Sequence, residues 1–129
     1  MKLSAKTSRI SRYEEIIYQL FKEKAGEELS VYDVLSAINI DKQIIALRTV
    51  YRMIEQLQLK RKIYCSSLKD GTRYFMLTNY YYIEMTCRIC GWKRKTISEV
   101  HCTYTGKPLM NFYVVGGQID CSGLCQKCS

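Results

Sequence analysis

The sequence has little of what enzymes and membrane proteins need. Its 129 residues include one histidine, His101, which disfavours catalysis by a histidine base, and no nucleophile–base pair is evident elsewhere. No apolar run reaches the ~20 residues that cross a bilayer. Residues 1–12 are polar and basic, without the apolar segment of a signal peptide. We therefore expect a cytoplasmic protein that is not an enzyme and has no membrane-spanning segment.

Positive charge is what the chain has in excess. Its formal net charge is +8 and its pI is near 9.2, which favours a polyanionic partner, either nucleic acid or an anionic membrane surface. Hydrophobic residues make up 47% of the chain, enough for one domain or two small ones. We find no internal repeat beyond two cysteine pairs, and no low-complexity segment.

Two C-x-x-C pairs, Cys87 with Cys90 and Cys125 with Cys128, are the most specific motif in the chain. A two-residue spacer lets both sulfurs of a pair face one ion at ~2.3 Å, and two such pairs complete a tetrahedral structural site. A redox C-x-x-C or disulfides are the alternatives, but cysteines of a cytoplasmic protein are more often thiols and metal ligands. The spacing predicts one structural Zn²⁺ per chain.

The N-terminal half has the pattern of three helices, over 13–24, 30–39 and 41–57. Apolar residues at helical spacing mark the inner face of each. The second begins with a capping-box pattern, in which Ser30 is the N-cap and Asp33 the carboxylate three residues later.

A hairpin pattern follows the third helix. Short β-prone runs at 62–65 and 72–77 flank Asp70-Gly71, a strong turn dipeptide. Three short helices followed by a hairpin are the plan of a winged helix-turn-helix, whose third helix enters the major groove of double-stranded DNA. We therefore expect residues 1–78 to form a winged-helix DNA-binding domain.

The outward face of the third helix carries Arg48, Tyr51, Arg52 and Glu55 at i, i+3, i+4 and i+7. Arginines bond guanine edges or phosphates, and a tyrosine packs on a thymine methyl or donates to a phosphate. A merely solvated helix face is the alternative. The residues predicted to contact DNA are Arg48, Thr49, Tyr51, Arg52, Lys6 and Arg73.

The C-terminal half, 79–129, reads as a small α/β module. We expect strands at 80–85, 92–97 and 109–115, with a short helix at 98–104. A module of about fifty residues buries too little apolar surface to form an independent core, so a structural zinc ion that cross-links it is physically reasonable. Exposed strand edges and aromatic residues also predict that the module forms a homodimer.

The sequence leaves two alternative roles open for each of four further side chains. Cys65, Cys102 and Cys121 are extra thiols, read either as buried small hydrophobes or as redox-active groups. His101 is read either as a histidine satisfied by hydrogen bonds or as a ligand of a metal site with Glu99, Cys102 or Cys121.

These motifs together resemble the ferric uptake regulator family of bacterial metal-responsive repressors. A-L-R-T-V-Y-R at 46–52 is similar to its recognition-helix signature, and C-R-I-C-G at 87–91 with G-L-C-Q-K-C at 123–128 is similar to its two zinc knuckles. The order of elements, winged helix followed by a dimerisation domain, is also similar. The resemblance implies an α+β fold and a homodimeric DNA-binding repressor with its four cysteines on zinc. An interaction module without an operator and an RNA-binding protein are the rival interpretations.

The regulatory metal site of that family is largely replaced here. Tyr82 and Glu84 stand where two ligand histidines would be expected, Glu28 where the family often has another, Met76 where a carboxylate is usual, and Gly117 near another common histidine. Few oxygen ligands make a weak, hard site, so we expect no iron or zinc sensing through it. A residual regulatory site would use Glu28, Tyr82, Glu84 and His101.

Overall fold

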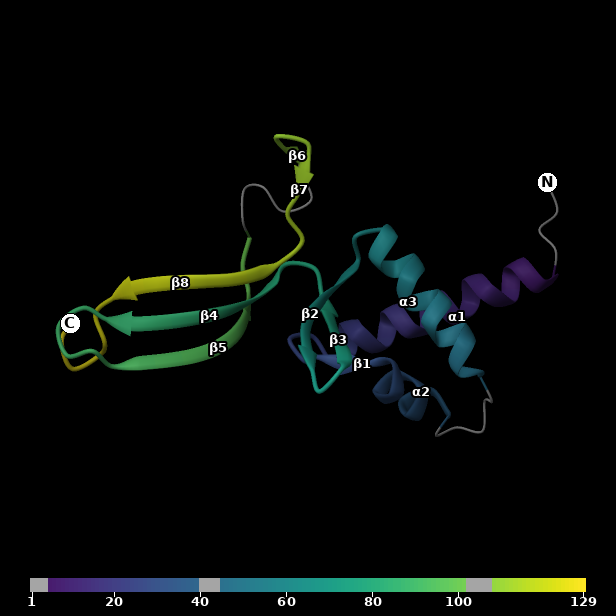
Figure 1. Cartoon of the computed structure of the whole chain (residues 1–129), viewed down its shortest axis with the longest axis horizontal. Helices are drawn as coiled ribbons and strands as arrows, with labels where there is room; N and C mark the ends of the chain where they lie inside the picture. The colour runs from purple at the N-terminus through teal and green to yellow at the C-terminus, as the bar shows by residue number, and fades with distance from the viewer. Residues whose placement is uncertain (1–4, 40–44, 102–107) are drawn as a thin grey trace. The chain divides into compact units, whose positions relative to one another are not determined.

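The computed structural model describes residues 5–39, 45–101 and 108–129, with side chains from residue 12 onward in the first helix. The chain divides into two compact units, Met1–Thr78 and Asn79–Ser129. Their elements are labelled in Figure 1. Helices followed by strands give the mixed α+β class that the sequence predicts, and this fold class is confirmed.

In the described part of the first unit, the helices are α1 (Ala5–Glu23), α2 (Val31–Asn39) and α3 (Leu47–Leu59). The prediction of a third helix from Asp41 is wrong in its start. Ala46 precedes α3 with an extended backbone, φ −76° and ψ 145°, so no helix runs through that residue. Asp41 itself lies outside the described residues.

The start of α2 is the capping box that the sequence predicts. The backbone N–H of Ser30 donates to Oδ2 of Asp33 over 2.9 Å, and the N–H of Asp33 donates to Oγ of Ser30 over 3.1 Å. Each side chain thus satisfies a donor that the helix leaves unpaired.

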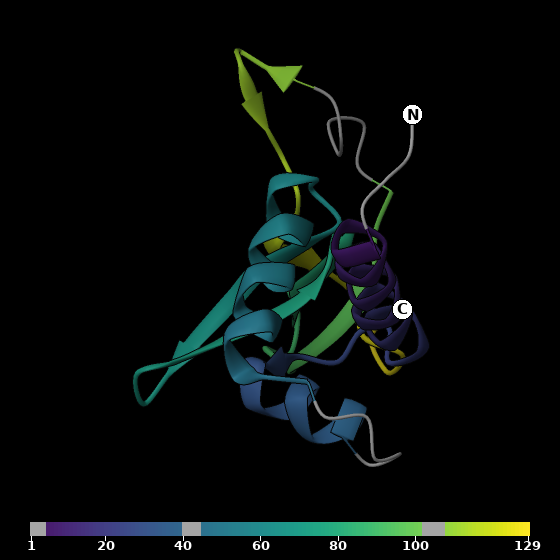
Figure 2. The same cartoon turned by 90° about the vertical axis from the view of Figure 1, so that its right-hand side faces the viewer.

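The strands β1 (Leu29–Ser30), β2 (Ile63–Lys69) and β3 (Thr72–Leu77) form an antiparallel sheet in the order β1-β3-β2. Asp70 and Gly71 between β2 and β3 have φ of 50° and 80°, the positive values that a two-residue hairpin turn requires. The predicted hairpin is therefore present, and Figure 2 shows it projecting beside α3.

One apolar core holds this unit together. The helices turn their apolar faces inward onto the sheet, and Val50, Ile54 and Leu57 of α3 are at most 2% exposed. Burial of this kind stabilises a fold by about 25 cal/mol per Å² of apolar surface. The buried cluster consists of Ile17, Phe21, Leu29, Val31, Val34, Ile38, Ile45, Val50, Met53, Ile54, Leu57, Ile63 and Phe75.

The second unit is a three-stranded sheet of β4 (Tyr80–Cys87), β5 (Lys93–Glu99) and β8 (Gly117–Gly123) in the order β5-β4-β8. The β4–β5 pair is antiparallel, whereas the β4–β8 pair is parallel. A short separate hairpin joins β6 (Pro108–Leu109) to β7 (Phe112–Tyr113).

Two expectations for this unit are wrong, and one of its strands was not expected from the sequence pattern. No helix begins at 98, because Ser98 and Glu99 pair with Tyr81 and Tyr80 as the end of β5; residues 102–104 lie outside the described residues. The expected strand over 109–115 is broken, because Met110 and Asn111 turn the chain with φ of 51° and 65°. The strand β8 was not predicted at all.

Burial in this sheet is sparse. Among its described residues, the buried hydrophobic side chains are Tyr81 and Cys87, whereas β5 is almost wholly exposed. The described part of this unit therefore has no core comparable to that of the first.

Within the described part of the chain, no helix combines the length and apolar character needed to cross a membrane.

Candidate metal centre and nucleic-acid interface

The parallel pairing of β4 with β8 brings the two cysteine pairs to one end of the sheet. Cys87, the last residue of β4, pairs with Gly123, the last residue of β8. Parallel strands end at the same edge, so the C-x-x-C segments that follow them start side by side, as Figure 1 shows near the C-terminus.

Backbone hydrogen bonds shape the first of these two turns. The N–H of Gly91 donates to the carbonyl of Cys87 over 3.0 Å, and the N–H of Cys87 donates to the carbonyl of Trp92 over 2.7 Å. Gly91 has φ +77°, a conformation that strains any residue with a side chain. The glycine after the first pair is thus required by the turn.

The second turn is built in the same way. The N–H of Cys128 donates to the carbonyl of Cys125 over 3.0 Å, and the N–H of Arg88 donates to the carbonyl of Gly123 over 2.9 Å. The second of these bonds ties the two turns together across the sheet end.

The four sulfurs converge. Sγ of Cys90 lies 3.6 Å from Sγ of Cys125, and the sulfurs of Cys87, Cys90, Cys125 and Cys128 all lie within 4.8 Å of one another. A tetrahedron with ~2.3 Å metal–sulfur bonds has sulfurs about 3.8 Å apart. The arrangement therefore fits a closed Cys₄ site, the donor set of structural zinc.

The electrostatics of the cluster favour a cation. Hydrogen bonds from the backbone of Cys90, and then of Cys125 and Ile89, lower the pKa of Cys87 to about 6. Hydrogen bonding with the thiols of Cys125 and Cys87 raises the pKa of Cys128 to about 12. Four thiolates this close repel one another, and a divalent ion that binds them removes this penalty.

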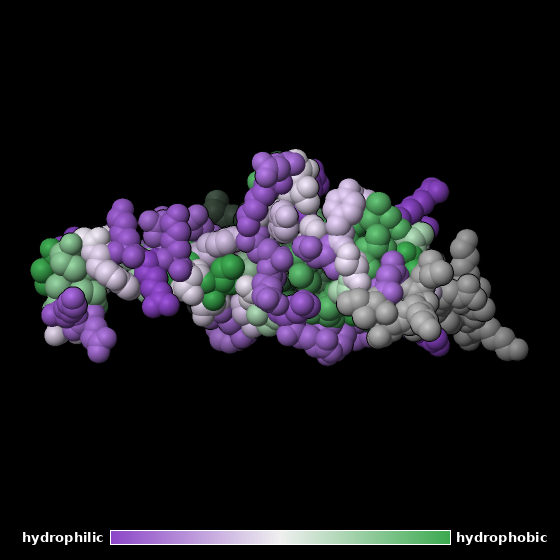
Figure 3. All heavy atoms as spheres, turned by 90° about the horizontal axis from the view of Figure 1, so that it is seen from below, coloured by the Kyte–Doolittle hydropathy of each residue, from purple (hydrophilic) through white to green (hydrophobic). Residues whose placement is uncertain are grey.

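Apolar side chains surround the two turns. Ile89 is 68% exposed, Trp92 44% and Leu124 57%. On the face shown in Figure 3, hydrophobic atoms gather at the end of the sheet where the chain terminates. Cys90 itself is exposed, and Cys125 and Cys128 are half-buried, so the cluster lies at the surface among these apolar side chains.

The two extra thiols in the described part of the chain are not buried. Cys65 and Cys121 are both exposed, so their interpretation as buried small hydrophobes is wrong, because β2 and β8 leave them uncovered. Cys121 lines a small hollow of about 200 Å³ together with Trp92 and Cys125. Cys102 lies outside the described residues.

The outer face of α3 carries the predicted DNA-contacting residues. Arg48, Arg52 and Glu55 are exposed, Tyr51 is 49% exposed, and Thr49 is half-buried. Within the described residues no ion pair engages either arginine, so their guanidinium groups are available to a partner.

A groove of about 510 Å³ lies between this face and the hairpin. It is lined by Tyr51, Glu55 and Gln58 of α3, by Tyr32 of α2, and by Arg73 of β3, among others. Two of the predicted residues, Tyr51 and Arg73, therefore line one surface hollow, although they are 22 positions apart in the sequence.

The carboxylate of Glu28 is bound by side chains of the first unit. Its Oε2 accepts hydrogen bonds from Oγ of Ser66, over 2.8 Å, and from Oγ of Ser67. Its Oε1 lies 3.4 Å from Nζ of Lys69. The extra residue at the β2 bulge, between Cys65 and Ser67, is what lets both hydroxyls reach this carboxylate.

The other residues proposed for a regulatory site lie in the second unit. Tyr82 and Glu84 follow one another on one face of β4, and His101 lies 3.4 Å from Oε1 of Glu99. In the described chain, the group of three or more metal-ligating side chains that converges is the cysteine cluster. Lys6 is in α1, but its side chain lies outside the described residues.

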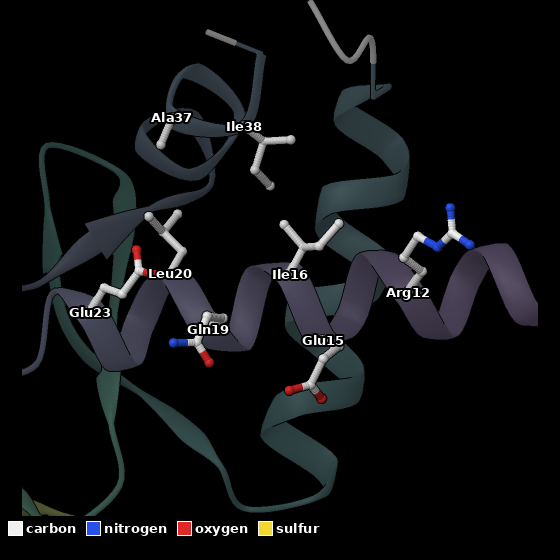
Figure 4. Close-up of a pocket in the computed structure, with 8 residues that line it drawn as sticks. All are labelled: Arg12, Glu15, Ile16, Gln19, Leu20, Glu23, Ala37 and Ile38. Carbon is white, nitrogen blue, oxygen red and sulfur yellow. The ribbon is translucent and has the colours of Figure 1, made fainter. Parts of the chain in front are cut away.

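A further hollow, of about 540 Å³, lies on α1 against α2. Figure 4 shows Ile16 and Leu20 of α1 pointing toward Ala37 and Ile38 of α2, with polar side chains around them. None of the predicted site residues lines it.

The sequence analysis missed two contributors to these sites. The strand β8 positions the second cysteine pair, and its alternation of Ile119 and Cys121 with polar residues was the available signal. Tyr32 lines the groove, and an exposed aromatic residue one position after the start of α2 was the only hint.

Comparison with solved structures shows what this fold is similar to. The chain aligns with a zinc uptake regulator, FurB, from Mycobacterium tuberculosis at 19% identity and a TM-score of 0.53, covering 98% of this chain and 100% of that one. It aligns with a peroxide stress regulator from Campylobacter jejuni at 14% identity and a TM-score of 0.53, covering 99% and 100%. At these identities the likeness establishes the fold.

A third similar structure is the ferric uptake regulator of Francisella tularensis with iron, at 17% identity and a TM-score of 0.50, covering 99% of this chain and 94% of that one. A search of curated protein sequences found no significant match. The sequence profile described as "Ferric uptake regulator family" matches residues 5–103, which include α3, the β2–β3 hairpin and the first cysteine pair. The chain belongs to the ferric uptake regulator family.

Proposed function

We propose that the protein is a homodimeric, DNA-binding transcriptional regulator, acting as a repressor, with one structural zinc ion per chain. The observation that carries this proposal is the outer face of α3. Arg48, Tyr51 and Arg52 are exposed there without ion-pair partners in the described chain, beside a hairpin that carries Arg73. An exposed basic helix face next to a wing is the arrangement that reads a major groove.

The metal proposal rests on the convergence of the four sulfurs within 4.8 Å. Cys87, Cys90, Cys125 and Cys128 would hold Zn²⁺ with no open coordination position, and a closed site of this kind stabilises structure and does not catalyse. Because the chain belongs to a family of regulators, we propose that it is a cytoplasmic regulator and not an enzyme.

The homodimer proposal rests on the sparse burial among the described residues of Asn79–Ser129. Buried hydrophobic residues in its described part are Tyr81 and Cys87, and both outer strands of the sheet, β5 and β8, have one edge without a strand partner there. A second copy that covers these surfaces would supply the missing burial.

A salt-dependent titration of full-length protein on duplex DNA tests the proposal. We expect binding with a steep salt dependence and a preferred sequence from a random pool. Tyr51→Ala and Arg52→Ala should each weaken binding to that sequence by about 1–3 kcal/mol. Arg94→Ala, which removes an equally exposed arginine from β5, is the matched control and should leave the sequence preference intact.

Unchanged DNA binding by a Tyr51→Ala/Arg52→Ala double variant would contradict the role of α3. Sedimentation of the full chain at micromolar concentration tests the dimer, and a monomer there would contradict that part alone.

The rival function is a zinc-stapled interaction module that binds protein and no operator. The exposed Ile89, Trp92 and Leu124 at the metal end favour it, because clustered apolar surface often marks a protein interface. If this rival function is correct, selection from the random pool of duplexes should yield no preferred sequence.

A further inference from the structure

Tyr32 and Tyr51 form a pair at the mouth of the groove beside α3. Tyr32 is in the first turn of α2 and is 54% exposed, and Tyr51 is on α3 and is 49% exposed. Both line the groove of about 510 Å³, together with Arg73 from β3. Three elements of the first unit, α2, α3 and β3, thus contribute polar side chains to the same hollow.

The two phenols interact through their hydroxyl groups. Hydrogen bonding with Tyr32 is the largest cause that raises the pKa of Tyr51. A phenol has one proton to donate and an oxygen that accepts, so a pair of phenols in this contact keeps one hydroxyl proton for an acceptor outside the pair.

Tyr32 is the more exposed of the two, at 54% against 49% for Tyr51, so it can present a hydroxyl proton to a partner outside the chain. A donor of this kind beside the guanidinium of Arg73 suits an anionic oxygen, because a charge-assisted hydrogen bond is about twice as strong as a neutral one.

Building on the proposed DNA-binding function, we propose that Tyr32 is a further DNA-contacting residue, which donates its hydroxyl to one backbone phosphate with Arg73 as the neighbouring cation. Tyrosine hydroxyls are common phosphate donors, and such contacts fix the position of a protein on the duplex without reading its sequence. Tyr51, which lines the same groove, then contacts the base through its ring.

Glu55 lines the same groove and carries the opposite charge. Its carboxylate repels a phosphate, so the contact depends on the neutral donor of Tyr32 as well as on Arg73. Removing this charge should therefore strengthen binding to every sequence.

The test uses the full-length protein and duplexes in which one phosphate at a time is a neutral methylphosphonate. Tyr32→Phe keeps the ring and removes the donor. We expect it to weaken binding by roughly tenfold, the size of one hydrogen bond to a charged group, by the same factor on the preferred and on unrelated sequences. Tyr18→Phe is the control, because the ring of Tyr18 is held between Lys22 and Lys62 and would stay there.

The methylphosphonate series locates the contact. One phosphate position should weaken wild-type binding markedly and Tyr32→Phe binding about tenfold less, which is the signature of a direct partner. Glu55→Gln should bind all duplexes more tightly than the wild type. A merely structural role for Tyr32 predicts no coupling to any phosphate, because phenylalanine preserves the packing.

The outcomes separate this inference from the function on which it rests. If wild-type protein binds no duplex, the proposed function fails. If wild-type protein binds and Tyr32→Phe binds equally well, or binds weakly without coupling to any phosphate position, the assignment of Tyr32 is overturned and the DNA-binding function stands.

Discussion

The apolar core of the first unit has no counterpart in the described part of the second. In Met1–Thr78, side chains from all three helices and the sheet meet in one buried cluster. In Asn79–Ser129, the β5-β4-β8 sheet leaves most of its side chains half or fully exposed, and four thiols converge at one of its ends, those of Cys87, Cys90, Cys125 and Cys128. The comparison indicates that burial stabilises the first unit, and it supports the proposal that the second depends on a metal ion and a partner.

Removing the metal should have the largest effect and should act on one unit only. Structural zinc contributes roughly 10–16 kcal/mol of apparent free energy in small zinc-dependent folds. A strong chelator, or the Cys87→Ser/Cys125→Ser double variant, should therefore abolish zinc binding and unfold Asn79–Ser129 while the helices persist. Amide hydrogen exchange, read separately over β4 and over α3, measures this difference.

The control is Cys121→Ser, which removes an exposed thiol outside the converging cluster and should leave zinc content unchanged. Full zinc retention in the double variant would contradict the metal site. Loss of protection over α3 as well would contradict the independence of the two units.

A substitution in the core of the first unit should destabilise that unit and leave the metal site of the second unit intact. Leu57 is fully buried in the cluster of the first unit, and truncating such a leucine costs about 2–5 kcal/mol. Leu57→Ala should lower the free energy of unfolding of the helices by this amount, measured by urea denaturation followed by circular dichroism, without loss of zinc.

Leu59→Ala is a matched control on the same helix, because Leu59 is 69% exposed. It should change the stability of the helices by less than about 0.5 kcal/mol. Equal effects of the two substitutions would show that the core described for this unit does not stabilise it.

The elements that the sequence predicted well are those specified by local chemistry. The capping box at Ser30 and Asp33 and the turn at Asp70-Gly71 each depend on residues within four positions, so the pattern alone identifies them. The start of α3 and the strand β8 depend on distant partners. Nothing near Gln118 indicates that it pairs with Tyr82, 36 positions earlier.

The two candidate sites also differ in whether local residues or distant ones determine them. The cysteine spacing predicts a four-sulfur cluster, because each C-x-x-C turn is local and repeated. The groove beside α3 joins Tyr32, Tyr51 and Arg73, which come from three separate elements. Its composition follows from the packing of α2 and β3 around α3, which residue spacing does not encode.

A smaller, local perturbation tests how far the stability of the first unit depends on details outside its core. Ser30→Ala removes the side chain that accepts from the N–H of Asp33. Loss of an N-cap of this type costs about 1 kcal/mol, so the midpoint of urea unfolding should fall slightly, with zinc content unaffected.

Ser36→Ala is the matched control, since Ser36 is exposed within the same helix. Alanine is the better helix former at an interior position, so this change should have no cost or a slight stabilising effect. A fall in stability equal to that of Ser30→Ala would contradict the capping role.

The smallest expected effect concerns a metal that would couple the two units. Glu28 would have to supply its carboxylate from the first unit, but that group already accepts from Ser66 and Ser67 and lies 3.4 Å from Nζ of Lys69. From the second unit, Tyr82 and Glu84 offer only oxygen ligands, which bind iron or zinc weakly. A ligand shifts an equilibrium only by its differential affinity for the two states. Adding iron, manganese or zinc to protein that retains its structural zinc should therefore change DNA affinity by no more than a few fold, measured by the same salt-controlled titration.

A hundredfold gain would correspond to about 2.7 kcal/mol of coupling and would show that a working sensor exists. In that case His101→Ala would be the first variant to examine, because His101 is the one imidazole in the chain and lies 3.4 Å from the carboxylate of Glu99.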